Sequence, residues 1–384
     1  MKLKPFLKLK GKNNLAKQHF ISILKMYKFL IYISYSYGFP IGKPIYEELK
    51  QRNYEVKWFV DTTEAKQHNP FAANTLDTVE EVLAYEPHIV LTAANVVPDF
   101  FPGLKVQIFH GFNAEKRNFR KGHFRIRGFF DLYCTQGPST TSIFKEKQKE
   151  HPHFDVIETG WSKMDAMFPI PEKEGNQRNT ILIASTFTKK LSLAFDEELF
   201  NKIKILSEKG TFKFMQILHP KLPDDIKSKW KSLQGENFQY HDTTDIIPLM
   251  HQADIMLSDT SSVIQEFLLQ RKPVVTFRHN IPQDHIINVN EVSKIEEALS
   301  YALSYPAKKI SLISKYISNI HPYDDGHSSA RIVDASILFL HKDKSYLKNK
   351  PINFARKWKV RRKLGYFTFK SFVRPFTLPK NKEI

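Results

Sequence analysis

The chain has 384 residues, of which 41% are hydrophobic and 13% aromatic, so it is long enough for two domains and apolar enough for a large core. Its single cysteine, Cys134, excludes an intramolecular disulfide, and the lack of a run of about 18 apolar residues argues against a membrane-spanning helix. The net charge of +18 is concentrated at the ends, because residues 1–28 contribute +8 and residues 341–384 contribute +12, which leaves the middle nearly neutral.

The basic segment 1–28 does not have the pattern of a signal peptide. Lysines at positions 2, 4, 8, 10, 12 and 17 interrupt every candidate apolar stretch. We therefore expect this segment to be a basic extension and the protein to be cytoplasmic.

From Phe29 onward, strand and helix patterns alternate, which is typical of an α/β fold with parallel strands. In the first half we predict strands at 29–34, 55–60, 87–93, 105–111 and 130–137, and helices at 43–52 and 75–85. The polar segment 169–179 contains Pro and Gly and is the predicted linker. In the second half we predict strands at 180–186, 213–220, 255–257 and 273–277, and helices at 193–210, 245–253, 267–272, 292–304 and 329–341.

These elements indicate two Rossmann-like domains, 29–168 and 180–340, that face each other across a cleft. The tail, 341–384, follows them and interleaves Lys and Arg with aromatic and apolar residues, among them Phe354, Trp358, Leu364, Phe367, Phe369 and Phe372. Such a composition suits an anionic membrane surface, which attracts the cations and accepts the rings. Nucleic acid is a weaker alternative partner, and a solvated terminus with no partner is a third interpretation.

The segment ADIMLSDTSSVIQEFLLQRKPVVTF, residues 253–277, has the layout of an anion-binding turn. A predicted strand is followed by Asp259, Thr260, Ser261 and Ser262, whose backbone N–H groups and hydroxyls would precede a helix and so suit a phosphate. Ser262 and Gln265 also match a capping box, and helix capping alone is the commoner explanation for such residues. Other strand ends decide between the two interpretations.

Two histidines follow predicted strands at equivalent places in the two halves. His110, before Gly111, ends the strand at 105–111, and His219 ends the strand at 213–220. Ligands bind at the carboxyl ends of parallel strands, and a neutral histidine there can take a proton from an acceptor hydroxyl. One such histidine is usually structural, but the pair favours a catalytic function.

Several further residues are candidates for substrate contacts. Thr186, after Ser185, is a second hydroxyl at a strand end, equally suited to capping a helix or to contacting a phosphate. Glu266 is either an acceptor for ribose hydroxyls, as acidic residues are in nucleotide sites, or a solvated helix residue. Asp165 either caps a helix or contacts ligand, and Gly326 lies in a turn that caps a helix or closes the cleft. Lys116 is a candidate phosphate ligand, and a basic surface loop with no ligand explains it equally well.

No motif for a metal or a bound cofactor is present in the sequence. It lacks His-Glu-x-x-His, a pair of cysteines and an Asp-x-Asp cluster. The dinucleotide-binding glycine fingerprint and the Gly-x-Ser-x-Gly elbow are also missing. We therefore expect neither metal nor cofactor, and we disfavour dehydrogenase and hydrolase activities.

The chain contains, in this order, QIFHG, ETGWSKMD, ILIASTF, ILHP, DTTDIIPLMHQADIMLSDTSSVIQEFLLQRKPVVTF and PYDDGHSSAR. With these motifs it resembles the CDP-glycerol glycerophosphotransferase family, the teichoic-acid type transferases of GT-B fold. The resemblance implies metal-free transfer of glycerol phosphate from CDP-glycerol, or a similar CDP-activated donor, to a hydroxyl of a lipid-linked or glycan acceptor. It implies that His110 is the base, that His219 is a second essential histidine, and that Asp259, Ser261 and Ser262 bind the donor diphosphate.

The resemblance gives the basic ends a purpose, which is to hold the enzyme at the inner face of the membrane as a peripheral protein. The identity of the donor is not determined by the resemblance, since ribitol phosphate or a sugar phosphate on CDP, or a nucleotide sugar, would also fit. The segments SDTSSVIQEF and KPVVTFR are also similar to those of UDP-N-acetylglucosamine 2-epimerases. Epimerase activity is therefore the second-ranked alternative. A non-enzymatic membrane-binding or nucleic-acid-binding protein ranks below both, because it leaves the paired histidines unexplained.

Overall fold

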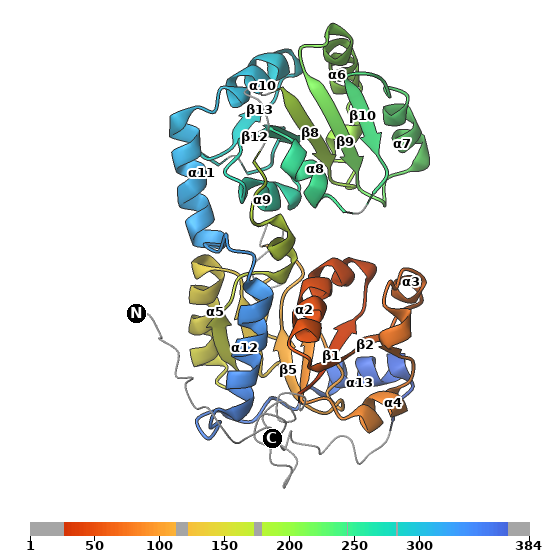
Figure 1. Ribbon diagram of the computed structural model, residues 1–384, viewed down its shortest axis with the longest axis vertical. Helices are drawn as coiled ribbons and strands as arrows, with labels where there is room; N and C mark the ends of the chain where they lie inside the picture. The colour runs from red at the N-terminus through yellow and green to blue at the C-terminus, as the bar shows by residue number, and fades with distance from the viewer. Residues whose placement is uncertain (1–26, 113–121, 173–178, 244, 282, 368–384) are drawn as a thin grey trace, which may run out of the picture.

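A computed structural model describes residues 27–112, 122–172, 179–243, 245–281 and 283–367. They form two α/β domains stacked end to end, with the first domain at the bottom of Figure 1 and the second at the top. The predicted fold class, two Rossmann-like domains with parallel strands, is confirmed.

The first domain is built on a seven-stranded parallel sheet with the order β3-β2-β1-β4-β5-β6-β7. Its strands are β1 (Lys28–Ile33), β2 (Glu55–Val60), β3 (Thr75–Leu76), β4 (Ile89–Thr92), β5 (Leu104–Gln107), β6 (Leu132–Thr135) and β7 (Asp155–Glu158). The chain order reverses at β1, which pairs with β2 on one side and β4 on the other. Such a switch point opens a crevice at the carboxyl ends of the strands.

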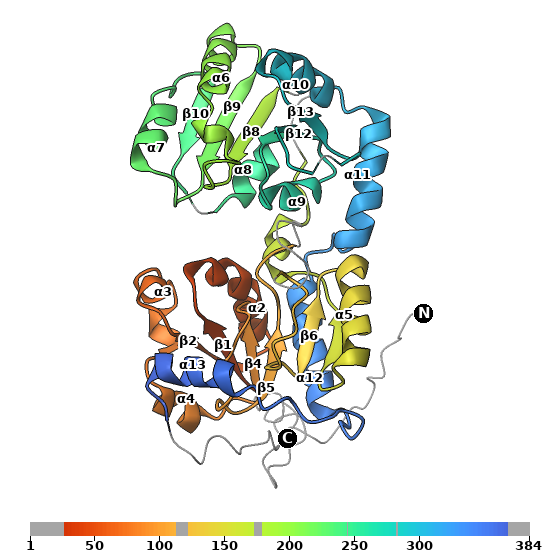
Figure 2. The ribbon, with the colours of Figure 1, turned by 180° about the vertical axis from the view of Figure 1, so that it is seen from behind.

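The helices of the first domain cover both faces of this sheet (Figures 1 and 2). They are η1 (Ser36–Gly38), α2 (Phe39–Gln51), α3 (Thr63–Gln67), η2 (Ala72–Asn74), α4 (Val79–Tyr85), α5 (Pro138–Glu150) and η3 (Ser162–Met167).

Two of these helices differ from the prediction. Helix α2 begins four residues early, at Phe39, because Pro40 lies in the first turn, where its missing N–H costs no helical hydrogen bond. The predicted helix 75–85 is in part strand β3, and α4 begins only after Thr78. The Thr78 hydroxyl accepts the N–H of Glu81, and this capping box fixes the start of the helix.

The second domain has a six-stranded parallel sheet with the order β10-β9-β8-β11-β12-β13. Its strands are β8 (Thr180–Ser185), β9 (Lys213–Leu218), β10 (Phe238–His241), β11 (Ile255–Ser258), β12 (Val274–Phe277) and β13 (Ile287–Val289). The switch point is β8, between β9 and β11. The two domains therefore repeat one topology.

The helices of the second domain are η4 (Leu193–Phe195), α6 (Glu197–Lys209), α7 (Asp224–Lys231), α8 (Ile247–Gln252), α9 (Val263–Leu268), η5 (Val292–Lys294) and α10 (Ile295–Leu303). Helix α6 ends on Gly210 as predicted, in a left-handed conformation with φ of 71°. Pro248 lies in the first turn of α8, also as predicted. The helix predicted at 267–272 is displaced: α9 ends at Leu268, before the left-handed Arg271.

The chain returns to the first domain through two long helices. Helix α11 (Ala307–Ile320) runs from the second domain toward the first, and α12 (Ser328–His341) lies beside α2, β6 and η3 (Figure 1). The sequence-derived boundary at residue 340 groups α12 with the second half. In the structure its apolar face packs on the first domain instead, through residues such as Ile332 and Val333.

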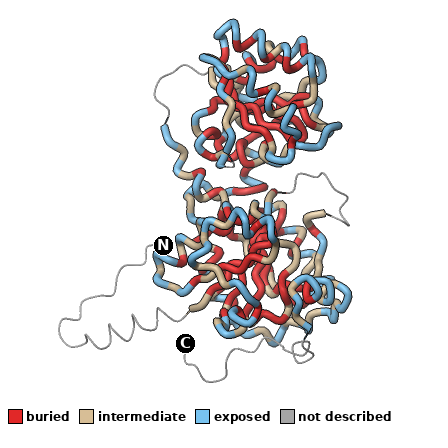
Figure 3. Tube along the Cα trace, turned by 90° about the vertical axis from the view of Figure 1, so that its right-hand side faces the viewer, coloured by how far each residue is buried: buried red, intermediate tan, exposed pale blue. Residues whose placement is uncertain are grey.

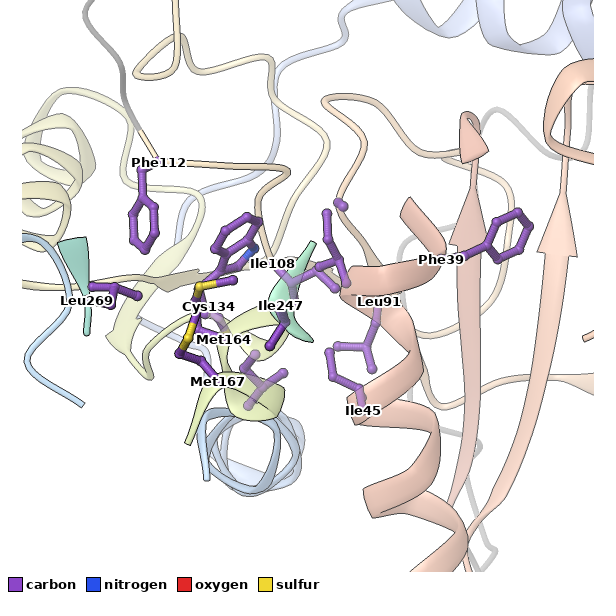
Figure 4. Close-up of a cluster of buried hydrophobic side chains, with 14 of the residues drawn as sticks. Phe39, Ile45, Leu91, Ile108, Phe112, Cys134, Met164, Met167, Ile247 and Leu269 are labelled. Atoms are coloured by element: carbon purple, nitrogen blue, oxygen red, sulfur yellow. The ribbon is translucent and has the colours of Figure 1, made fainter. Parts of the chain in front are cut away.

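Buried residues gather in the centre of each domain (Figure 3), and one cluster continues across the junction. Met164 and Met167 of η3 belong to this cluster, together with Ile247 and Leu269 of the second domain (Figure 4). The two domains therefore share apolar contacts beneath the cleft, and these contacts limit how far they can separate.

The start of the basic tail is part of the first domain. Helix α13 (Phe354–Leu364) lies across the sheet and buries Val360 and Arg361 (Figure 2). The guanidinium of Arg361 donates to Asp99 at 2.8 Å and lies 4.8 Å from the ring centre of Phe100. Phe369 and Phe372 lie outside the described residues.

Among the described residues, none of the helices has the length and hydropathy that crossing a bilayer requires.

We predict that Arg361→Ala will destabilise the protein. Arg361 is fully buried, and its removal leaves the largely buried carboxylate of Asp99 without its cation. Loss of one partner of such a pair costs about 3 kcal/mol, measurable as a lower free energy of unfolding in urea. The neighbouring exposed Arg362→Ala is the control and should change it by less than about 0.5 kcal/mol. Equal effects of the two variants would show that the buried Arg361–Asp99 pair contributes nothing specific to stability.

Candidate active site

The carboxyl ends of the two sheets border a shared interdomain region. A cavity between the domains is lined by Phe112, which follows β5, and by Thr260 and Ser261, which follow β11. The pKa of Glu64 in α3 is lowered, first by a hydrogen bond with Ser36 and also by the nearby charge of Lys221, which follows β9. The charge of Lys221 is therefore a second link between the two domains. The strand ends of both domains therefore meet here.

His110 is exposed at the end of β5, and a strained backbone precedes it. Phe109 has a φ of 57°, which is rare for a bulky residue. Its carbonyl accepts the indole N–H of Trp161 at 3.1 Å, and its ring stacks on His123 at 4.8 Å. Burial lowers the pKa of His123 to about 3, so this support is neutral. These contacts hold Phe109 in its strained conformation and so direct His110 outward.

His219 follows β9 and is partly exposed. Its Nδ1 accepts the backbone N–H of Lys221 at 3.1 Å, so the neutral ring carries its proton on Nε2. The ring lies 4.5 Å from that of Phe187, a residue that follows β8 and is 44% exposed. This arrangement gives His219 the character of a hydrogen-bond donor.

Asp259 is fully buried and faces the protein interior. Its carboxylate accepts the Ser185 hydroxyl at 2.7 Å and the backbone N–H groups of Thr186 and Leu193. Asp259 therefore fixes the loop after β8 against the turn after β11. The same bonds bury Thr186, which is 7% exposed and whose N–H is directed to Asp259.

The turn after Asp259 has a different geometry from the predicted one. Ser262 is exposed and has helical dihedral angles, φ −71° and ψ −15°, so its side chain does not cap α9 and the predicted capping box is wrong. Gln265 donates to the Tyr316 hydroxyl instead. The Thr260 hydroxyl accepts the N–H of Asn280, whereas Ser261 lines the interdomain cavity beside it.

Glu266 bridges the domains. Its carboxylate accepts Lys163 Nζ of η3 at 2.6 Å, and the two side chains are 10% and 22% exposed. The same ammonium lies 5.5 Å from the ring centre of Trp161, which supports Phe109. The sequence did not identify Lys163 or Trp161 as site residues, since their importance depends on contacts between distant segments.

Asp165 and Gly326 hold η3 against the start of α12. The Asp165 carboxylate accepts the N–H groups of Ser328 and Ser329 at 2.8 and 2.7 Å, so of the two roles considered for Asp165, capping is the one observed. Gly326 has a φ of 71°, and a Cβ there would lie 3.0 Å from the carbonyl oxygen of Phe168. This close approach requires glycine.

The remaining candidates are less informative. Gly111 is partly exposed, and a Cβ added to it would meet no heavy atom within 4 Å, so the space beside it is open. Lys116 lies outside the described residues. Within the described parts of the chain, the His, Cys, Asp and Glu side chains form no group of three or more that could hold a metal ion.

A third strand-end histidine escaped the sequence analysis. His279 follows β12, and its Nδ1 accepts the N–H of Ile281 at 3.1 Å, as His219 does with Lys221. It lines the cavity beside Thr260 and Ser261. The segment TFRHN already showed a histidine just after a predicted strand, but Arg278 lies between the strand and His279 and made the pattern less clear.

Two parallel-sheet domains that meet at their strand ends define a GT-B type fold. Solved structures with this architecture match most of the chain. Their sequence identity is only 14–17%, so the similarity shows the fold and not the function. The sequence settles the family. The chain belongs to the CDP-glycerol:poly(glycerophosphate) glycerophosphotransferase family, whose model matches residues 42–338, and is an enzyme of this class.

Three of the similar structures show that this fold by itself does not identify the reaction. The wall teichoic acid polymerase TagF has 15% identity and a TM-score of 0.58, over 82% of this chain and 88% of that one. MnaA of S. aureus, solved with UDP, has 14% identity and a TM-score of 0.59, over 85% and 99%. The UDP-GlcNAc 2-epimerase of Neisseria meningitidis, bound to UDP-GlcNAc, has 17% identity and a TM-score of 0.55, over 81% and 99%. No curated protein matches the sequence.

We predict that Lys163 and Glu266 couple the domains energetically. Lys163→Met and Glu266→Gln should each lower the free energy of unfolding, because each leaves a largely buried group without its partner. The double variant should recover at least about 1 kcal/mol relative to the sum of the single effects in a double-mutant cycle.

The control cycle uses Arg271 and Asp324, which form an ion pair between half-exposed side chains. Its coupling energy should stay below about 0.5 kcal/mol. A Lys163–Glu266 coupling that is no larger would contradict the proposed link.

Proposed function

We propose that this enzyme transfers glycerol phosphate, or a related polyol phosphate, from a CDP-activated donor to a hydroxyl of a membrane-associated, lipid-linked or glycan acceptor of the cell envelope. Synthesis of a teichoic-acid type polymer is the process that fits this reaction. The observation that carries the proposal is the family match over residues 42–338, which includes both strand-end histidines. A TagF structure obtained after a soak with CDPG adds support from the same fold.

In the proposed reaction, His110 acts as the general base. The acceptor oxygen attacks the outer phosphorus of the donor while His110 takes the hydroxyl proton. The bond between this phosphorus and the bridging oxygen breaks, and CMP leaves with the electron pair. The exposed position of His110 and the strained, well-supported backbone of Phe109 before it favour this role.

The second domain stabilises the donor in this mechanism. His219 presents Nε2–H, which suits the developing charge on the diphosphate, and the hydroxyls of Ser261 and Ser262 supply neutral donors. We assign Asp259 a positioning role, because a buried carboxylate that already accepts three donors is unsuited to a diphosphate. Glu266 is the candidate partner of the ribose hydroxyls, and Lys163 holds its carboxylate in place.

The outer face of α13 is the proposed membrane contact. Phe354 and Trp358 stack with ring centres 6.1 Å apart and are 60% and 43% exposed. Lys359 and Arg362 on the same helix are exposed as well. Rings beside cations suit anionic headgroups, so the enzyme would lie on the cytoplasmic face of the membrane as a peripheral protein.

We predict that His110→Ala will lower kcat by about two to four orders of magnitude, the usual contribution of a general base. Affinity for CDP-glycerol, measured by calorimetry, should change little, because the donor contacts lie on the second domain. His151→Ala replaces an exposed histidine of the same domain and is the control. Turnover at the normal rate in His110→Ala would disprove the base assignment.

We predict that Phe354→Ala with Trp358→Ala will weaken sedimentation with phosphatidylglycerol vesicles roughly tenfold, since the two rings lose their apolar burial in the interface. Binding of the unchanged protein should also fall with salt. Leu338→Ala is the control, because Leu338 is 71% exposed but lies on α12. Unchanged vesicle binding by the aromatic double variant would refute α13 as the contact.

A further inference from the structure

Two tyrosines in the turn after β1 are exposed beside His110. Tyr35 and Tyr37 are 53% and 49% exposed, and their rings stack with centres 5.5 Å apart and planes 13° apart. The ring centre of Tyr37 lies 6.0 Å from that of His110. Strand β1 is the switch point of the first sheet, where a crevice for ligands opens. An exposed aromatic pair therefore borders the proposed base.

The turn that carries the two rings is fixed by hydrogen bonds to the segment after β2. The backbone N–H of Ser36 donates to the carboxylate of Glu64 at 3.1 Å, and the Ser36 hydroxyl bonds to the same group. The Thr62 hydroxyl donates to the carbonyl of Ser34 at 2.8 Å. The backbone beneath the rings is therefore in place before a ligand binds, which lowers the entropic cost of binding.

Packing in the core does not explain the pair. The clusters of buried residues in the described part of the first domain include Tyr32, but neither Tyr35 nor Tyr37. Single exposed rings are common on protein surfaces, whereas rings that lie together beside a crevice are typical of a binding surface. The two rings are therefore available to a ligand.

The ligand that suits the pair is a neutral ring with a C–H face. The face of an aromatic ring is electron-rich, so it attracts C–H groups and repels anions. A pyranose sugar presents several C–H groups on one side and carries its hydroxyls around the rim. A polyol phosphate chain has no such face. Lys221 of the second domain acts on the charge of Glu64 and balances it, so this part of the surface offers a phosphate no net attraction.

The position of the pair relates it to the acceptor. In the proposed reaction His110 takes the acceptor proton, and the donor contacts lie on the second domain. The 6.0 Å between the ring centres of Tyr37 and His110 is less than the width of a hexose with its hydroxyls. A hexose that stacks on Tyr37 therefore brings a rim hydroxyl within reach of the imidazole.

We propose that Tyr35 and Tyr37 bind a pyranose ring of the acceptor and direct one of its hydroxyls to His110. The enzyme would then transfer to a sugar and not to a polyol phosphate chain. The assignment of this sugar as the acceptor rests on the proposed function, whereas sugar binding by the two rings can be measured without it.

The test measures binding by saturation-transfer NMR. Methyl β-glucopyranoside and methyl N-acetyl-β-glucosaminide are the ring probes, and ribitol and glycerol phosphate are the probes without a ring. The two glycosides should bind through their ring C–H protons, and the other two probes should not. Tyr37→Ala should weaken glycoside binding about threefold to tenfold, as the loss of one aromatic contact implies. Tyr37→Phe keeps the ring and should bind normally.

Tyr301→Ala is the matched control, because Tyr301 is 48% exposed but lies on α10. Affinity for CDP-glycerol, measured by calorimetry, should be equal in all variants. Three results would overturn the proposal: neither glycoside binds, the probes without a ring bind as well as the glycosides, or Tyr37→Ala binds the glycosides normally. Weaker CDP-glycerol binding by Tyr37→Ala would also overturn it, because the rings would then stack on cytosine. If the unchanged protein binds glycosides but no cytidine ligand, the proposed function fails while the sugar site stands.

Discussion

The short helix η3 connects the two domains, and most of the site depends on how it is held. The Ser162 hydroxyl donates to Ile41 of α2, Lys163 pairs with Glu266 of α9, and Asp165 caps α12. The carbonyl of Met167 is bonded to His251 of α8. Four elements from both domains are thus fixed to one six-residue helix, and the methionines of η3 fill the apolar junction between the domains.

This connection reaches the proposed base through Trp161, the residue before η3. Its indole N–H bonds to the carbonyl of Phe109, and its backbone N–H donates to His321 at 3.0 Å. Burial lowers the pKa of His321 to about 4, so this acceptor stays neutral. The carboxylate of Glu266 in the second domain and the strained backbone before His110 are therefore held by neighbouring residues of one segment. A change of domain orientation would disturb both together.

Polar residues of the site divide into exposed ones and more buried ones that bond to the protein itself. Asp259, Asp165 and Gly326 are conspicuous in the sequence, but each is engaged with the protein itself. His110 and Ser262 are exposed, and His219 is partly so. A carboxylate buried with its donors satisfied can fix a loop without repelling an anionic ligand. In the proposed mechanism, this separation lets buried acids lie near the donor diphosphate without repelling it.

The sequence by itself determined the alternating parallel strands, the two-domain GT-B type fold, the family and the strand-end positions of His110, His219 and Ser261. Those features follow from local periodicity and from motif order, which need no knowledge of distant contacts. Only the tertiary structure decided that Lys163 pairs with Glu266, that α12 and α13 complete the first domain, and that His279 borders a cavity with Thr260. These depend on packing between segments far apart in the chain, and local pattern does not encode which side of a turn or helix will be buried.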